Sequence, residues 1–96
     1  MYEVKLKPQA QRFIKRQSQK VKRQLIKNIE ALQEDPRPPS SKLLDGRKKI
    51  YRVRSGNYRI VYQVKDKVLL VIVAKVDDRK NIYKNLKYVT ERLGKI

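Results

Sequence analysis

Three arginines surround one tight turn in the segment YRVRSGNYRIVYQV, residues 51–64. Gly56-Asn57 is a recognised two-residue hairpin turn, so Arg52, Arg54 and Arg59 are expected to lie close together. Guanidinium groups bind phosphate through paired hydrogen bonds, which lysine cannot match. Arg79 follows the next apolar run, and Tyr83 lies about one helical turn beyond it. This combination suggests chemistry on a phosphodiester.

The hairpin turn also predicts the register of the two strands. Ser55 would lie opposite Tyr58, Arg54 opposite Arg59, and Arg52 opposite Val61. Side chains alternate across a strand, so the three arginines share one face. That face continues with Gln63, Leu70, Ile72 and Ala74, and a regular register would place Arg59 opposite Ala74. The other face is uniformly apolar and is expected to bury the helices: Tyr51, Val53, Ile60, Tyr62, Val64, Leu69, Val71 and Val73.

An external counter-charge is expected on the arginine face. Like charges directly opposite each other destabilise a sheet by roughly 0.2–1 kcal/mol, and the hairpin offers no carboxylate to neutralise them. The alternative is an ordinary solvated face, with the ring of Tyr83 packed on the sheet. The pattern alone does not separate the two interpretations.

The surrounding elements predict an α+β fold in the order β-α-α-β-β-β-α. A short strand over 2–6 precedes a helix that starts at Pro8. Ser18 caps a second helix, which Asp35-Pro36 ends. Strands over 49–55, 58–65 and 67–76 form an antiparallel-rich sheet, with both N-terminal helices on one face. A last helix begins near Lys80, with Asp77 or Asp78 as its cap. Residues 1–96 are expected to form a single domain.

The amino-acid composition limits the kinds of partner that this chain is expected to bind. The chain has 26 Lys and Arg against 9 Asp and Glu, a net charge of +17, and neither histidine nor cysteine. Disulfides are excluded and the usual zinc ligands are missing, so no metal and no cofactor is expected. Neither a membrane span nor a signal peptide is apparent, and a cytoplasmic protein fits. This charge calls for an acidic partner: nucleic acid, an anionic membrane surface or an acidic protein.

The sequence resembles the RelE/ParE superfamily of bacterial toxins. The resemblance rests on KLLDGRKKIYRVRSGNYRIVYQV, a following strand and then VDDRKNIYK, and it covers nearly the whole chain. It implies a RelE-like microbial ribonuclease fold. It also implies a toxin of a type II toxin–antitoxin system, an endoribonuclease that cleaves mRNA in the ribosomal A site. The implied partners are mRNA, the ribosome with its 16S ribosomal RNA, and an acidic cognate antitoxin, without a membrane.

The resemblance also implies residue roles. Arg52 and Arg54 match two catalytic lysines of the RelE type, and Arg59 matches the arginine of the Gly-x-Tyr-Arg segment. Arg79 is similar to the arginine before the last helix, and Tyr83 to the catalytic tyrosine. Two departures stand out: both lysines are arginines here, and Asp78 replaces a histidine or basic residue. With no histidine, Tyr83 is expected to be the base for attack by the 2′-hydroxyl.

Two other functions remain open. The fold is shared with ParE-like inhibitors of DNA gyrase, which act without nuclease chemistry. A small nucleic-acid-binding module without catalysis would also suit the charge. The apolar stripe of the last helix, Ile82, Leu86, Val89 and Leu93, could exchange the core for an antitoxin or pack permanently.

Overall fold

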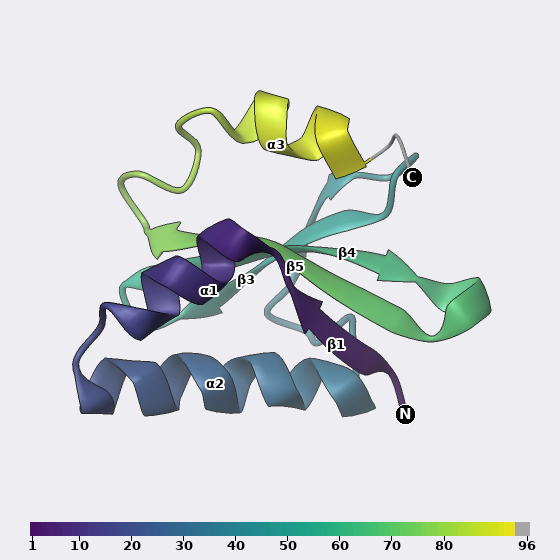
Figure 1. Cartoon of the computed structure of the whole chain (residues 1–96). Coiled ribbons are helices and arrows are strands. Elements are labelled where there is room, and N and C mark those ends of the chain that lie inside the picture. The colour runs from purple at the N-terminus through teal and green to yellow at the C-terminus, as the bar shows by residue number, and fades with distance from the viewer. Residues whose placement is uncertain (94–96) are drawn as a thin grey trace.

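The computed structural model describes residues 1–93 and has the predicted α+β architecture. A five-stranded sheet has the order β1-β5-β4-β3-β2, in which β1 is parallel to β5 and the other neighbours are antiparallel. Helices α1 and α2 cover one face, and α3 lies on the other (Figure 1). The elements are β1 (Glu3–Leu6), α1 (Pro8–Lys15), α2 (Gln19–Glu34), β2 (Lys42–Asp45), β3 (Ile50–Ser55), β4 (Tyr58–Lys65), the 3-10 turn η1 (Asp66–Val68), β5 (Leu70–Asp78) and α3 (Leu86–Leu93).

Both N-terminal helices begin, and α2 ends, where the sequence predicts. Pro8 occupies the first turn of α1, where its missing N–H costs nothing. The Ser18 hydroxyl accepts a bond from the backbone N–H of Val21 at 3.3 Å and caps α2. Helix α2 ends before Asp35-Pro36, because the residue before a proline avoids the helical region.

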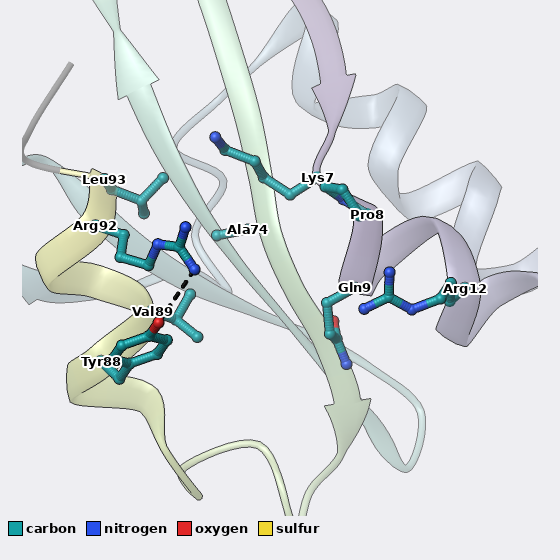
Figure 2. A pocket seen from close by; sticks show the side chains of 9 residues that line it. All are labelled: Lys7, Pro8, Gln9, Arg12, Ala74, Tyr88, Val89, Arg92 and Leu93. Atoms are coloured by element: carbon teal, nitrogen blue, oxygen red, sulfur yellow. Dashed lines mark hydrogen bonds between the residues drawn. The ribbon is translucent and has the colours of Figure 1, made fainter.

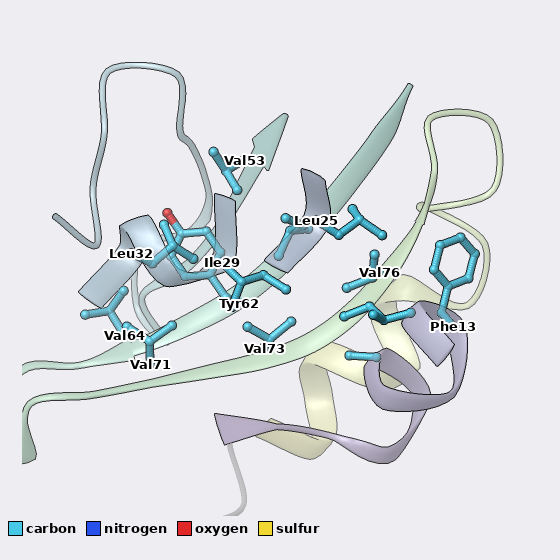
Figure 3. Close-up of a cluster of buried hydrophobic side chains, with 13 residues drawn as sticks. Phe13, Leu25, Ile29, Leu32, Val53, Tyr62, Val64, Val71, Val73 and Val76 are labelled. Atoms are coloured by element: carbon cyan, nitrogen blue, oxygen red, sulfur yellow. The ribbon is translucent and has the colours of Figure 1, made fainter. Parts of the chain in front are cut away.

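The larger hydrophobic core lies between the sheet and these two helices (Figure 3). It contains the predicted apolar face of the hairpin, including Val53, Ile60 and Tyr62, and the stripe of α2. Leu69 was wrongly predicted to belong to it. Its side chain is half exposed and its backbone is left-handed, with φ of 50°, because η1 replaces a two-residue turn before β5.

Two further differences concern the elements. Residues 42–45, for which the sequence analysis predicted no strand, pair with β3 as the additional short strand β2. The last helix begins at Leu86 and not near Lys80, because residues 79–85 form a succession of turns. Asp78 starts these turns: one carboxylate oxygen accepts from the backbone N–H of Lys80 and Asn81.

The arginine-bearing face of the sheet is only partly open. A second core, with Val61, Ile72 and Ala74 from the sheet, buries Ile82 and Leu93. The stripe predicted for the last helix therefore packs on the face that the sequence analysis left uncovered. None of the helices within residues 1–93 is long and apolar enough to cross a membrane.

Asp66 joins three segments at the end of the sheet away from the hairpin turn. Its carboxylate accepts from Tyr2 Oη at 2.7 Å, Arg37 Nη2 at 2.7 Å and Lys49 Nζ at 2.9 Å. The Arg37 bond, followed by those from Tyr2 and Lys49, holds the pKa of Asp66 well below its ordinary 3.8. Asp66 thereby ties β1 and the α2–β2 loop to the meander.

The substitution Asp66→Asn should lower the free energy of unfolding at pH 7 by about 1–3 kcal/mol, since charge-assisted bonds become neutral ones. A carboxyl with a depressed folded-state pKa stabilises the fold above its unfolded-state value, near 3.8, and loses this contribution as the pH falls below it. Urea denaturation between pH 7 and pH 2 should therefore show a shallower acid loss in the variant. Equal acid slopes in both proteins would contradict this, and Glu30→Gln on the exposed side of α2 is the control.

Candidate active site

The hairpin register places the three arginines together as predicted. Arg54 lies directly opposite Arg59, Arg52 opposite Val61, and Ser55 opposite Tyr58. Because directly opposed side chains share a face, all three guanidinium groups arise from the same side of β3 and β4. Arg54 is exposed, whereas Arg52 and Arg59 are partly buried.

The close approach of α2 fixes the turn between these strands. Gly56 has φ of +61°, which favours glycine, and an added Cβ would lie 2.8 Å from Gln24 Nε2. Next to it, the buried Ser55 hydroxyl accepts from Asn28 Nδ2 of α2 at 2.7 Å. The arginine-bearing end of the hairpin is therefore held by the long helix beneath it.

A β-bulge changes what lies opposite Arg59. Val61 pairs with Lys75 and Tyr62 with Val73, which leaves Ala74 as the extra residue of β5. Arg59 consequently lies opposite Asp77, and its predicted pairing with Ala74 is wrong. A regular register would have turned Lys75 toward the main core, so the bulge moves a charged side chain to the arginine face.

Tyr83 lies within hydrogen-bonding distance of the arginines. Arg52 Nη1 donates to the Tyr83 hydroxyl oxygen at 2.7 Å, although the ring is half exposed. Ile82, the preceding residue, is fully buried in the second core and anchors the turn on the sheet. The tyrosine therefore lies at the arginine cluster, on a turn and not on the predicted helix.

Arg79 joins the same cluster through its backbone. Its N–H donates to the Asn57 carbonyl of the hairpin turn at 2.9 Å, so the end of β5 lies against that turn. The side chain of Arg79 is exposed. Within residues 1–93, Asp77 and Asp78 form no ion pair with it; Asp78 instead binds backbone N–H groups and the Asn81 amide.

The charges of the cluster act on one another. Partial burial lowers the pKa of Arg59, and the neighbouring charges of Arg54, Arg52 and Arg79 lower it further, while Tyr83 acts in the opposite sense. Arg59 Nη1 donates to the carbonyls of Gly56 and Tyr58, at 3.0 and 2.9 Å. Arg52 Nε is buried without a partner among the described residues. The cluster therefore combines mutually repelling positive charges with a free donor.

Partial burial works to raise the pKa of Asp78, but the bonds from Asn81 and Lys80 outweigh it, so the pKa lies below its ordinary value. This carboxylate is therefore ionised and committed to the start of the Tyr83 turn. Within residues 1–93 no cluster of three or more acidic side chains could hold a metal ion. The chemistry available here is that of guanidinium groups and a phenol.

A separate groove of about 500 Å³ lies between α3 and the start of α1 (Figure 2). Lys7, Arg12 and Arg92 line it, and Ala74 of β5 contributes to its floor. Tyr88 also lines this groove, and its hydroxyl accepts from Arg92 Nη1 at 3.2 Å. None of the five predicted site residues lines it. The candidate site is an open surface at the hairpin end, and this groove is a different basic surface.

Comparison with known proteins identifies the class. Residues 4–83 match the family of the ParE toxin of the type II toxin–antitoxin system parDE. The chain belongs to the RelE/ParE superfamily and is a toxin of a type II toxin–antitoxin system. No curated protein sequence is significantly similar to it.

Solved structures that are similar to this chain include RelE proteins. A doubly substituted variant of Escherichia coli toxin RelE in the free state is 28% identical, with a TM-score of 0.75, and the match covers 95% of this chain and 96% of that one. The toxin of the intact E. coli RelBE complex is 31% identical, with a TM-score of 0.69 and coverage of 81% and 96%. The archaeal RelE–RelB complex from Pyrococcus horikoshii OT3 contains a chain that is 25% identical to this one, with a TM-score of 0.75. The match covers 81% of this chain and 94% of that chain.

Removing one of the two opposed arginines should stabilise the fold. Arg54→Gln should raise the free energy of unfolding by roughly 0.2–1 kcal/mol at low salt, because it relieves repulsion across the strands. The gain should shrink near 1 M salt, where the screening length falls to about 3 Å. Urea denaturation at the two salt concentrations measures this, with Arg23→Gln on α2 as the control. A variant no more stable than the parent at low salt would contradict the expectation.

Proposed function

We propose that this toxin is a metal-independent endoribonuclease that cleaves mRNA in the ribosomal A site and so inhibits translation. The observation that carries the proposal is the bond from Arg52 to the Tyr83 hydroxyl oxygen, inside a cluster of arginines that forms no ion pair within the described residues. A phenol and several cations at one surface suit proton transfer next to a phosphate.

The arginines would bind the scissile phosphate. Arg54 is exposed, and Arg52 and Arg59 are partly buried beside it. Guanidinium groups bind phosphate oxygens in paired geometry, and they stabilise the extra negative charge that develops as a phosphorane forms. An anion placed among the arginines would also offset the repulsion that Arg54, Arg52 and Arg79 exert on Arg59.

Tyr83 would act as the base. Its oxygen takes the proton of the 2′-hydroxyl, the 2′-oxygen bonds to phosphorus, and the bond from phosphorus to the 5′-oxygen breaks. The products are a 2′,3′-cyclic phosphate and a 5′-hydroxyl. A water molecule beside Arg79 would protonate the departing 5′-oxygen, and the hydroxide so formed would take the proton back from Tyr83, which restores the base. The guanidinium of Arg52 stabilises the negative charge of the phenolate that accepts the proton. No oxidation or metal is required in this sequence of steps.

The ribosome would supply the substrate geometry. A phenolate is only a modest base for a ribose hydroxyl, and positioning of the substrate can contribute several kcal/mol of barrier reduction. The basic side chains of α1 and α2 suit sequence-independent contacts with 16S ribosomal RNA. They are Arg12, Lys15, Arg16, Lys20, Lys22, Arg23 and Lys27.

The expected protein partner is an acidic antitoxin. The net charge of +17 favours such a partner. The groove between α1 and α3 offers three basic side chains around an apolar floor, which suits an amphipathic acidic segment. The RelBE complexes among the similar structures support this, since each pairs a toxin with its antitoxin.

The second candidate is inhibition of DNA gyrase without nuclease chemistry, which the match to the ParE family favours. Purified toxin added to gyrase supercoiling reactions, and in parallel to ribosomes carrying mRNA, separates the two functions. Cleavage of A-site mRNA with unimpaired supercoiling is the expected result. Inhibited supercoiling with intact mRNA would overturn the proposal.

Tyr83→Phe should reduce the single-turnover rate of A-site cleavage by about 10²–10⁴-fold, the range for loss of a general base. Tyr88→Phe, which alters another exposed tyrosine on α3, is the matched control and should cleave at the parental rate. Primer extension on programmed ribosomes measures both. A Tyr83→Phe variant with full activity would remove the assignment of the base.

A further inference from the structure

Lys75 stands apart from the other lysines because it is buried. Only 7% of the residue is exposed, and among the buried polar side chains of residues 1–93 it is the charged one. It lies on β5 opposite Val61, which in turn lies opposite Arg52. Arg52, Val61 and Lys75 therefore form one row across three strands, on the face that carries the candidate site.

The ammonium group of Lys75 binds the turn that carries Tyr83. Its Nζ donates to the carbonyl of Asn81 at 3.3 Å and to the carbonyl of Lys84. These two residues flank Ile82 and Tyr83 in the chain. The lysine thus holds the turn at both ends, and no ion pair accompanies it within the described residues.

Burial of this ammonium group costs free energy that packing of the core does not require. Burial lowers the pKa of Lys75, although Asp77 acts in the opposite sense, so the charged form is disfavoured relative to water. An apolar side chain of similar length would avoid the cost of desolvating an ammonium. What the lysine provides, and an apolar residue cannot, is a pair of donors aimed at the turn.

Three contacts then determine where the phenol lies. Ile82 anchors the middle of the turn over Val61, Lys75 holds it from the β5 side, and Arg52 binds the Tyr83 oxygen from the β3 side. We propose that Lys75 is a positioning residue, whose ammonium clamps the 81–84 turn and thereby keeps Tyr83 on the arginine cluster. The consequence for catalysis rests on the proposed function, whereas the clamp itself does not.

Removing the Lys75 ammonium should have different effects according to whether the lysine clamps the turn or only stabilises the fold. Loss of the clamp should loosen the turn and leave the sheet intact, because the freed carbonyls lie in a partly exposed segment that water can reach. Loss of a structural lysine should weaken the whole fold. Local and global opening can be separated by amide hydrogen exchange, since turn amides and core amides report different events.

The test compares Lys75→Met and Lys75→Arg with the parent, and Lys87→Met on the exposed side of α3 is the control. In Lys75→Met the backbone amides of Ile82, Lys84 and Leu86 should exchange about tenfold faster or more, while those of β4 and the thermal midpoint stay unchanged. Lys75→Arg, which keeps the charge and donors, should restore part of the protection. Unchanged turn exchange in Lys75→Met, or faster exchange throughout the sheet, would overturn the clamp.

Cleavage kinetics on programmed ribosomes then test its role. The single-turnover rate of Lys75→Met should fall about tenfold or more, because a small displacement of a reacting group is costly, while half-saturation with ribosomes stays the same. A loss in half-saturation with an unchanged maximal rate would contradict a positioning role. If the parent chain cleaves no mRNA, the proposed function fails, and the exchange data still decide whether the clamp exists.

Discussion

The contact between Arg52 and Tyr83 joins two parts of the chain that lie 31 positions apart. Its formation requires that the hairpin present the arginine on the second face of the sheet, and that the chain after β5 return across that same face. Burial of Ile82 meets the second requirement, because a fully buried side chain fixes the turn against Val61 and its neighbours. The phenol itself remains half exposed, so a large substrate can reach it.

The same geometry concentrates positive charge at a cost to stability. Arg54 and Arg59 lie directly opposite each other, and Arg52 and Arg79 add to the field at Arg59. Asp78 does not relieve this, since it is occupied by the backbone of the Tyr83 turn. Asp77 lies opposite Arg59 but forms no ion pair with the arginines within residues 1–93. The two hydrophobic cores and the Asp66 contacts at the far end of the sheet offset the repulsion.

Much of this surface could be predicted from the sequence because a two-residue turn determines the pairing of every residue in its hairpin. Gly56-Asn57 therefore placed Arg52, Arg54 and Arg59 on one face, and the structure has that register. The bulge at Ala74 lies between β4 and β5, so the Gly56-Asn57 turn, which joins β3 to β4, could not reveal it. A signal was present nevertheless: a regular register turned Lys75 toward an apolar core, which a charged side chain avoids. The start of α3 was predicted too early for a different reason. An aspartate such as Asp78 can cap a turn as readily as a helix, so the sequence alone did not distinguish the two.

Replacement of the reacting hydroxyl tests the central claim most directly. Purified toxin would be added to ribosomes programmed with an mRNA that carries a single 2′-deoxynucleotide on the 5′ side of the scissile bond, with the all-ribose mRNA beside it. The account predicts that the ribose message is cut to a 2′,3′-cyclic phosphate and a 5′-hydroxyl, and that the deoxy-substituted message stays intact at that bond. Cleavage of the substituted message at the same position would show that the arginine cluster and Tyr83 do not act through the 2′-oxygen, and would contradict the account.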